Sequence, residues 1–162
     1  MTLVLNRIDD RLIHGQVVVG WGQPLDLSFI VLVDDTVASQ EWEQELYRMG
    51  VPPEMEVYFH SAADAATKVD GYRTETRRGL LLTGDIATMR VLVERAGVRD
   101  VNIGGIHHRA GRTQHLRYVF LTPDEQAALR ELEQLGAIVT AQDVPSAKSV
   151  PLTELLAARE VA

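Results

Sequence analysis

The run from Ser28 to Asp34, Ser-Phe-Ile-Val-Leu-Val-Asp, constrains the fold more than any other segment of this sequence. Its interior is apolar throughout and rich in β-branched residues, and a polar residue bounds it at each end. A strand with one solvated face would alternate apolar and polar residues, so this unbroken run indicates a strand buried on both faces. Strands of this kind belong to parallel sheets that are covered by helices on each side.

Segments with a strand pattern and segments with a helix pattern alternate along the rest of the chain. Strands are predicted at residues 2–9, 28–34, 56–59, 79–83, 100–103, 116–121 and 137–144. Helices are predicted at residues 15–21, at 39–49 with Ser39 as cap, from about 61, and at 86–96, 123–135 and 152–159. This alternation predicts one α/β domain over residues 1–162, with a mostly parallel sheet and helices on both faces.

Composition narrows the class of protein. The formal net charge of -7 disfavours nucleic acid as a partner. The absence of cysteine excludes disulfides, thiolate metal sites and a cysteine nucleophile. No apolar run reaches the ~18 residues of a spanning helix, and the first residues do not resemble a secretory signal. We therefore expect a soluble cytoplasmic domain, and nothing in the sequence calls for a cofactor.

Chemically reactive side chains gather in the loops after the predicted strands, where sheets of this type bind ligands. The loops contain Asp9, Asp10, Arg11 and His14; Asp34, Asp35 and Thr36; Thr83, Gly84 and Asp85; and Gly104, Gly105, His107 and His108. We expect these loops to converge on one cleft. Asp34 and Asp35 could form an acidic pocket, but a helix cap beside a solvated carboxylate is the favoured interpretation.

His14 is the strongest candidate for catalysis because it precedes Gly15 at a predicted strand-to-helix junction. Backbone N–H groups and the positive end of a helix dipole favour a negatively charged group there, and phosphate is the obvious one. Arg11 can offer a planar pair of donors to phosphate, as can the N–H groups of Gly15 and Gln16.

The two carboxylates beside Arg11 receive supporting roles. Asp10 accepts hydrogen bonds only and would repel phosphate, so we expect it to hold Arg11 or the loop. Asp9 is expected to orient the loop as well. Neither is predicted to touch the phosphate itself.

Residues 7–21, Arg-Ile-Asp-Asp-Arg-Leu-Ile-His-Gly-Gln-Val-Val-Val-Gly-Trp, are a specific signature. They resemble the N-terminal motif of IIB subunits of the mannose/fructose/sorbose class of the bacterial sugar phosphotransferase system (PTS). The resemblance continues at residues 30–38, at residues 101–107 with Gly111, and at Val144-Pro145. It implies a mostly parallel sheet between helices.

The same resemblance implies a function. His14 would accept a phosphoryl group on Nδ1 from a phosphohistidine of a IIA partner and pass it to a sugar bound by the membrane IIC and IID partners. The sugar itself is not predicted, because IIB contacts little of it. Many members carry an arginine just before the Val-Pro pair, where it can face the phosphohistidine. Here Gln142 and Asp143 stand in that stretch, which weakens the expected positive field.

Several residues keep two interpretations. Thr83, Gly104, Gly105 and His107 could line the cleft. Arg109 and Arg112 could form a basic rim that guides an acidic partner, or a solvated turn, and Arg7 and Arg11 are expected on segments near them. A metal site at His107, His108 and His115 is disfavoured, because adjacent histidines on a strand point to opposite faces. Trp21 and Trp42 are expected to be core or half-buried.

Three functional classes remain open. The first is a phosphotransferase that serves a sugar permease, and the second is a regulatory phosphocarrier of an incomplete PTS without transport. The third is a binding module whose aspartates hold a cation, which the His14 motif disfavours. A homodimer is also left open.

Overall fold

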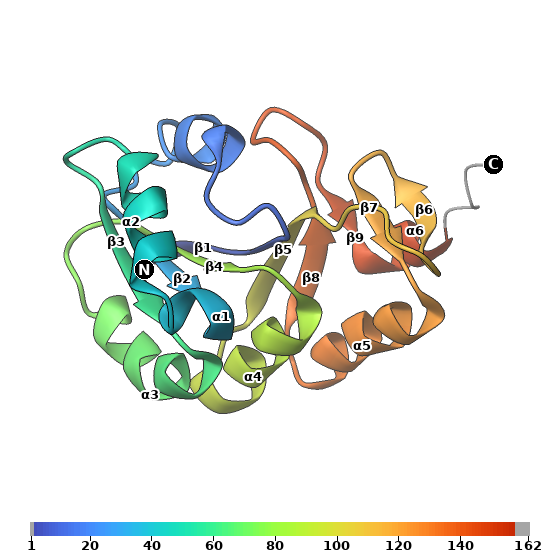
Figure 1. Cartoon of the computed structure of the whole chain (residues 1–162). Coiled ribbons are helices and arrows are strands. Elements are labelled where there is room, and N and C mark those ends of the chain that lie inside the picture. Colours follow the sequence, from blue (N-terminus) through green and yellow to red (C-terminus); the bar gives the residue numbers. More distant parts are fainter. Residues whose placement is uncertain (1, 158–162) are drawn as a thin grey trace.

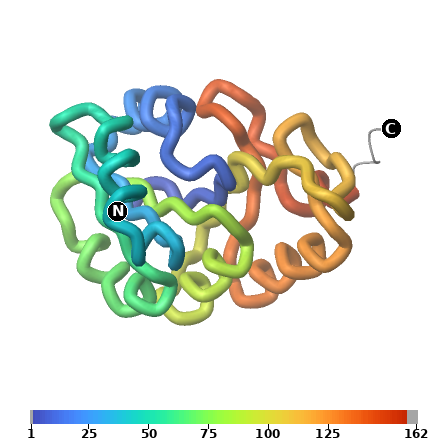
Figure 2. The backbone as a smooth tube through the Cα atoms, viewed as in Figure 1, coloured from blue at the N-terminus to red at the C-terminus, as the bar shows by residue number. Residues whose placement is uncertain are grey.

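The computed structural model describes residues 2–157, and its centre is a seven-stranded sheet. Figure 1 shows the strands as arrows between the helices, and Figure 2 follows the backbone through the same view. The strand order is β3-β2-β4-β1-β5-β8-β9, and every neighbouring pair is parallel except β8 with β9. The strands are β1 (Leu3–Asp9), β2 (Phe29–Val33), β3 (Glu56–His60), β4 (Gly79–Thr83), β5 (Asp100–Gly105), β8 (Ile138–Ala141) and β9 (Val150–Pro151). The predicted α/β class with a mostly parallel sheet is confirmed.

Helices cover both faces of the sheet (Figure 1). One face carries α3 (Ala62–Arg73), α4 (Ile86–Ala96), α5 (Pro123–Gln134) and α6 (Leu152–Ala157). The other carries the π-helix η1 (Gln16–Trp21), α1 (Asp35–Ala38) and α2 (Glu41–Met49). Strand β2 belongs to both cores, since Val31 packs in the first and Leu32 in the second, and both are fully buried. This explains its unbroken apolar sequence.

The prediction of a single strand at residues 116–121 is wrong. The chain instead forms a separate antiparallel hairpin of β6 (Thr113–Leu116) and β7 (Val119–Leu121). The turn at Arg117 and Tyr118 divides what looked like one apolar run. The strand predicted at 137–144 is likewise shorter, and the antiparallel edge strand β9 follows it.

The predicted second helix also differs from the observed one. Ser39 ends the short helix α1, which was not predicted, and Gln40 is the N-cap of α2. The residue of α2 that packs against the sheet is Tyr47, which contacts Phe59 of β3 with the ring centroids 6.5 Å apart. The apolar residues at helical spacing therefore face solvent: Trp42 is 62% exposed, and Leu46 and Met49 are exposed as well.

Two other predictions at the ends of the chain have mixed outcomes. Trp21 is buried as expected, and its indole N–H donates to the carbonyl of Asp143. The last helix is described only as far as Ala157, so its predicted end at residue 159 lies outside the described residues. Between residues 2 and 157 no helix is long and apolar enough to cross a membrane.

The carboxyl end of β1 is the natural position for a site. β1 lies between β4 and β5, and the chain runs from β1 toward the β3 edge before it returns to β5 on the other side. Strand order therefore reverses around β1, and open parallel sheets bind ligands at such switch points.

Candidate functional site

The loop between β1 and η1 makes a tight turn that places His14. The N–H of Leu12 donates to the carbonyl of Asp9 at 2.9 Å, and Leu12 adopts a left-handed conformation with φ 59°. This conformation is costly for a residue with a Cβ. The side chain of Leu12 lies close to Gly84, where a Cβ would be 2.9 Å from Leu12 Cδ2. Val17 and Val18 donate to the carbonyl of His14, so the helical pattern starts at this residue.

Asp9 is the centre of the charge arrangement. Its side chain is fully buried, and Oδ2 accepts hydrogen bonds from Arg7 at 3.1 Å and Arg11 at 3.2 Å. Oδ1 accepts from the backbone N–H and Nε of Arg11 at 3.1 and 3.2 Å. One carboxylate thus holds two guanidinium groups and fixes the start of the loop, which is the arrangement expected if Asp9 orients it.

Arg7 lies on the segment expected near the His14 loop, and its side chain is fully buried there against Asp9. Its Nη1 donates to Asn102 Oδ1 at 2.7 Å and to the carbonyl of Gln142 at 3.0 Å. Burial lowers the pKa of Arg7, and the charge of Asp9 opposes this change. Gly104 is needed for the packing, because a Cβ there would overlap the guanidinium carbon of Arg7.

The imidazole of His14 is held between two oxygen atoms and is 20% exposed. Its Nδ1 lies 2.8 Å from the carbonyl oxygen of Leu12, and its Nε2 lies 3.7 Å from Asp9 Oδ2. Nε2 is buried and has no hydrogen-bond partner within the described residues. Each ring nitrogen of His14 therefore faces an oxygen atom of the protein, Nδ1 the nearer one and Nε2 the more distant one.

Asp10 ties the β1 loop to the loop after β5. Its carboxylate accepts from the backbone N–H of His107 at 2.7 Å and lies 2.5 Å from His107 Nδ1. Of the two roles predicted for Asp10, it therefore holds the loop, and its partner is His107 rather than Arg11. Gly105 leaves the space for this contact, because a Cβ there would be 3.0 Å from both Asp9 Oδ1 and His107 Cε1.

A hollow of about 240 Å³ opens beside the His14 loop. Its walls are Arg11, Gln16, His107, Arg117, Tyr118 and Asp143. Three of these residues were candidates from the sequence: Arg11, Gln16 and His107. Arg11 precedes His14 in the sequence and Gln16 follows it. Arg11 Nη2 donates to Gln16 Oε1 at 2.5 Å, so the two side chains lie together in the wall of the hollow.

Sequence reasoning missed Arg117 and Tyr118, because the hairpin turn that carries them was read as a strand. Arg117 Nη2 pairs with Asp143 Oδ2 at 2.9 Å. Burial and the charge of Asp143 raise the pKa of Tyr118, so its hydroxyl stays neutral and able to donate. The charge of Arg117 within an otherwise apolar and aromatic run is the one signal available in the sequence.

Other candidate residues lie away from the hollow. Thr83 is fully buried, and its hydroxyl donates to the carbonyl of Asp85 at 3.3 Å. Arg112 makes two hydrogen bonds to Glu125 at 2.8 and 2.7 Å, which raise the pKa of Arg112 and hold the start of α5. Its predicted place in a free basic rim is therefore wrong, and Arg109 alone of that pair is exposed.

The cap interpretation of Asp34 and Asp35 is confirmed. Asp34 caps α1 by accepting from the N–H of Val37 at 2.9 Å. Asp35 accepts from the N–H of Ala62 at the start of α3. Among residues 2–157 no group of three His, Cys, Asp or Glu side chains has the geometry to hold a metal ion.

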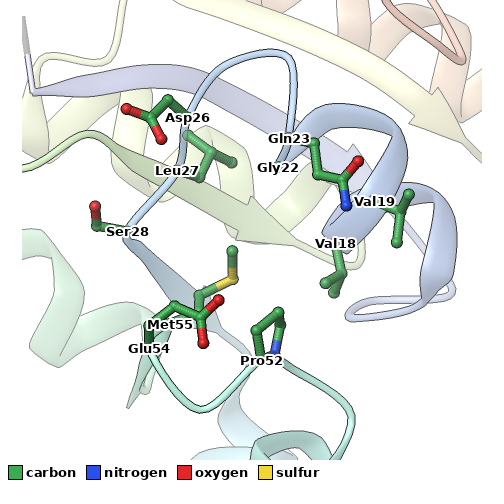
Figure 3. Close-up of a pocket in the computed structure, with 10 residues that line it drawn as sticks. All are labelled: Val18, Val19, Gly22, Gln23, Asp26, Leu27, Ser28, Pro52, Glu54 and Met55. Atoms are coloured by element: carbon green, nitrogen blue, oxygen red, sulfur yellow. The ribbon is translucent and has the colours of Figure 1, made fainter.

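A second hollow, of about 310 Å³, lies on the η1 side of the sheet (Figure 3). Val18 and Val19 of η1 form one side, and Pro52 and Met55 of the loop before β3 form another. None of the predicted site residues lines it. The chemistry therefore concentrates at the carboxyl end of β1.

Comparison with known proteins agrees with this geometry. Residues 3–162 match the family model of the PTS system sorbose subfamily IIB component. The chain belongs to this family. IIB components are phosphotransferases of the sugar PTS, so this chain is a member of a phosphotransferase family.

Individual relatives support the assignment to the sorbose subfamily. The chain is 33% identical over 156 residues to the sorbose-specific EIIB component of Klebsiella pneumoniae, covering 95% of this chain and 94% of the relative. The crystal structure of the IIBSor domain of the sorbose permease from the same organism superimposes with a TM-score of 0.86 at 30% identity, covering 96% of both chains. The mannose-specific EIIAB component of Escherichia coli is 28% identical over 160 residues, which is 96% of this chain and 49% of that protein.

Proposed function

We propose that this IIB protein accepts a phosphoryl group on Nδ1 of His14 from a phosphohistidine of a IIA partner. It then passes the group to a sugar bound by a membrane IIC/IID permease. The EIIAB relative, whose name joins IIA to IIB, supports IIA as the donor. The relatives' names include sorbose, N-acetylgalactosamine and mannose, so these three sugars are the ones to assay as acceptors.

The observation that carries the proposal is the position of His14 Nε2, 3.7 Å from a carboxylate that two arginines hold. A proton on Nε2 directed at Asp9 leaves the lone pair on Nδ1, since a neutral imidazole carries one proton. In the resting structure the carbonyl oxygen of Leu12, 2.8 Å from Nδ1, accepts the hydrogen bond and so places the proton on Nδ1. Asp9 would hold the proton on Nε2 once the ring has turned away from that carbonyl, and Nδ1 would then be the nucleophile. A carboxylate that fixes a reactive imidazole in this way is a recurrent device.

The transfer is balanced once the single imidazole proton has moved from Nδ1 to Nε2. The Nδ1 lone pair forms the new N–P bond while the N–P bond of the donor phosphohistidine breaks, and the electron pair of that bond returns to the donor imidazole. Because Nδ1 lies 2.8 Å from the carbonyl of Leu12, the ring turns away from this carbonyl before attack. Phosphoryl transfer needs positioning and charge stabilisation above all, so a tightly held turn suits it.

Arg11 and the N–H groups of Gly15 and Gln16 would stabilise the transferred group. Arg11 is 39% exposed and lines the hollow, so part of its guanidinium is accessible while Asp9 holds the rest. Charge-assisted, bidentate contacts are the strong ones for phosphate. Asp9 and Asp10 would act through Arg11, His14 and His107 rather than by touching phosphate.

The site of phosphorylation is tested by incubation with the phosphorylated general carrier and a IIA protein, followed by mass spectrometry under alkaline conditions. The wild-type chain should gain one phosphate, and His14→Ala should gain none. His108→Ala is the matched control, because His108 is exposed and packs edge-on against Phe120. A His14→Ala chain that still gains one phosphate would refute the assignment.

The role of Arg11 is tested by Arg11→Lys, which keeps the charge but loses the planar pair of donors. We expect transfer from phosphorylated IIA to slow about tenfold, the loss that corresponds to one charge-assisted contact. The melting temperature should change little. An unchanged transfer rate would remove Arg11 from the site.

A further inference from the structure

The hollow beside the His14 loop contains a guanidinium from outside the β1 loop, paired with the carboxylate of Asp143 that also lines it. Arg7 and Arg11 share the single carboxylate of Asp9, and Arg117 adds a third guanidinium from the β6–β7 turn. Arg117 and Arg11 both line the hollow. Two arginines that face one polar hollow, next to a histidine, form the kind of surroundings that bind an anion.

Asp143 holds Arg117 at this hollow and is itself rigidly placed. Its carbonyl accepts from Trp21 Nε1 at 2.8 Å and from Arg7 Nη2 at 3.1 Å. Its Oδ1 accepts a hydrogen bond from the N–H of Val144 at 3.0 Å, and its Oδ2 accepts one from Nη2 of Arg117 at 2.9 Å. The backbone of Asp143 is therefore fixed to the buried arginine, and its carboxylate to the next N–H, while the arginine that it pairs with is exposed.

The Arg117 side chain is 85% exposed, and an ion pair of this exposure contributes little to stability. Such a pair is easily exchanged for a stronger one. A phosphoryl group carries about two negative charges and three acceptor oxygens, and so offers a guanidinium more than a single carboxylate does.

We propose that Arg117 is a second phosphate-binding arginine, which Asp143 holds at the hollow until a phosphoryl group is present on His14. Arg11 then contacts the group from the β1 loop and Arg117 from the β6–β7 turn, since both line the hollow. Tyr118 lines it as well, and its neutral hydroxyl would be a further donor for a phosphate oxygen. This inference rests on the proposed phosphorylation of His14.

The test is the pKa of the phosphoryl group itself, measured by phosphorus NMR on the intact chain after labelling with phosphoramidate or with phosphorylated IIA. The ionisable groups on the walls are Arg11, His107, Arg117, Tyr118 and Asp143, and those bonded to or next to the walls are Arg7, Asp9, Asp10, His14 and Arg112. An ordinary phosphoryl group has a second pKa of about 6. A cation in contact stabilises the dianion and lowers this value.

Arg117→Gln should raise the phosphoryl pKa by about 0.5–1 unit, and Arg117→Lys should restore most of the difference because it keeps the charge. The matched control is Arg95→Gln, which removes an exposed arginine from the last turn of α4, where the chain leads into the start of β5. It should leave the phosphoryl pKa unchanged. The melting temperature should be the same in all three variants, so a purely structural role would not produce this pattern.

Two failures are distinguishable. A phosphoryl pKa on His14 that is equal in Arg117→Gln and wild type overturns the role of Arg117 and leaves the proposed function intact. A wild-type chain that gains no phosphoryl group on His14 from either donor overturns both proposals.

Discussion

Arg7 and Arg117 each pair with an aspartate at the carboxyl edge of the sheet, but their surroundings are opposite. The Arg7–Asp9 pair is fully buried, whereas the Arg117 side chain is 85% exposed beside a nearly buried Asp143. Arg7 also bonds Asn102 and the carbonyls of Gln142 and Asp143, while Arg117 makes a single ion pair. One arginine is part of the core, and the other is part of the surface.

The comparison shows that burial gives chemically similar ion pairs different roles. A buried charge that loses its partner is strongly destabilising, because no water replaces the lost contact. An exposed pair contributes little and can be exchanged. Arg7 therefore fixes the geometry on which the chemistry depends, and Arg117 is available to respond to a ligand.

The largest effect is expected for Arg7→Met, which leaves the Asp9 carboxylate buried with only Arg11 opposite it. We expect a loss of about 3–5 kcal/mol in the free energy of unfolding. Urea denaturation at pH 7 measures this loss. The double variant Arg7→Met with Asp9→Asn should recover part of it, because it removes the uncompensated charge. A single variant as stable as wild type would contradict the distinction drawn between the two pairs.

Gly104→Ala approaches the same pair from the packing side. Its new Cβ would overlap the Arg7 guanidinium, which is held by several hydrogen bonds and cannot move freely. Overpacking of this kind costs about 3 kcal/mol in unfolding free energy. Gly71→Ala is the control: it lies within α3 with nothing near its added Cβ, and alanine there should stabilise the chain by up to about 1 kcal/mol. Equal effects in the two variants would argue against the tight packing at Arg7.

The pair of Arg112 and Glu125 lies between the two extremes, at 12% and 25% exposure. Burial alone would raise the pKa of Glu125, but hydrogen bonds from Arg112 and Thr122 outweigh it and hold the pKa below its usual value. Stability from this lowered pKa is present above the pKa of the unfolded chain, about 4.3, and is lost as the pH falls through the folded value. We expect Arg112→Met to cost about 1–2 kcal/mol at pH 7, and thermal unfolding should show this cost shrink as the pH falls through the lowered pKa of Glu125.

The smallest effect on stability is expected for Arg117→Gln, below about 1 kcal/mol. The change in melting temperature should be within a few degrees, measured by calorimetry beside Arg95→Gln. A loss comparable to that of Arg7→Met would place Arg117 in the structural network instead of the ligand site.

The sequence predicts secondary structure best where burial alone decides whether a residue is apolar or polar. The strands β2 and β4 were predicted within a residue because burial on both faces requires unbroken apolar runs. Periodicity in α2 identified residues that share a face, but it could not say that Tyr47, rather than Trp42, packs against the sheet. His14 and Arg11 can be proposed from the sequence because their neighbours in sequence are also their neighbours in space.

The rest of the site depends on contacts between distant segments. The burial of Arg7 needs Asn102 and Gly104 on another strand, and hydropathy alone assigns an arginine to the surface. Arg117 reaches Asp143 over 26 positions of sequence, across a hairpin whose turn was not recognised. The sequence pattern contains no local signal for either pair.

The two-residue strand β9 has a consequence for how this molecule behaves at high concentration. The outer edge of a sheet exposes backbone donors and acceptors that can template aggregation with another chain. Here the edge beside β8 ends in Val150 and Pro151, and proline has no N–H to offer. An incoming strand would find too few partners to add to the sheet, so this side of the molecule is protected against fibre-like stacking.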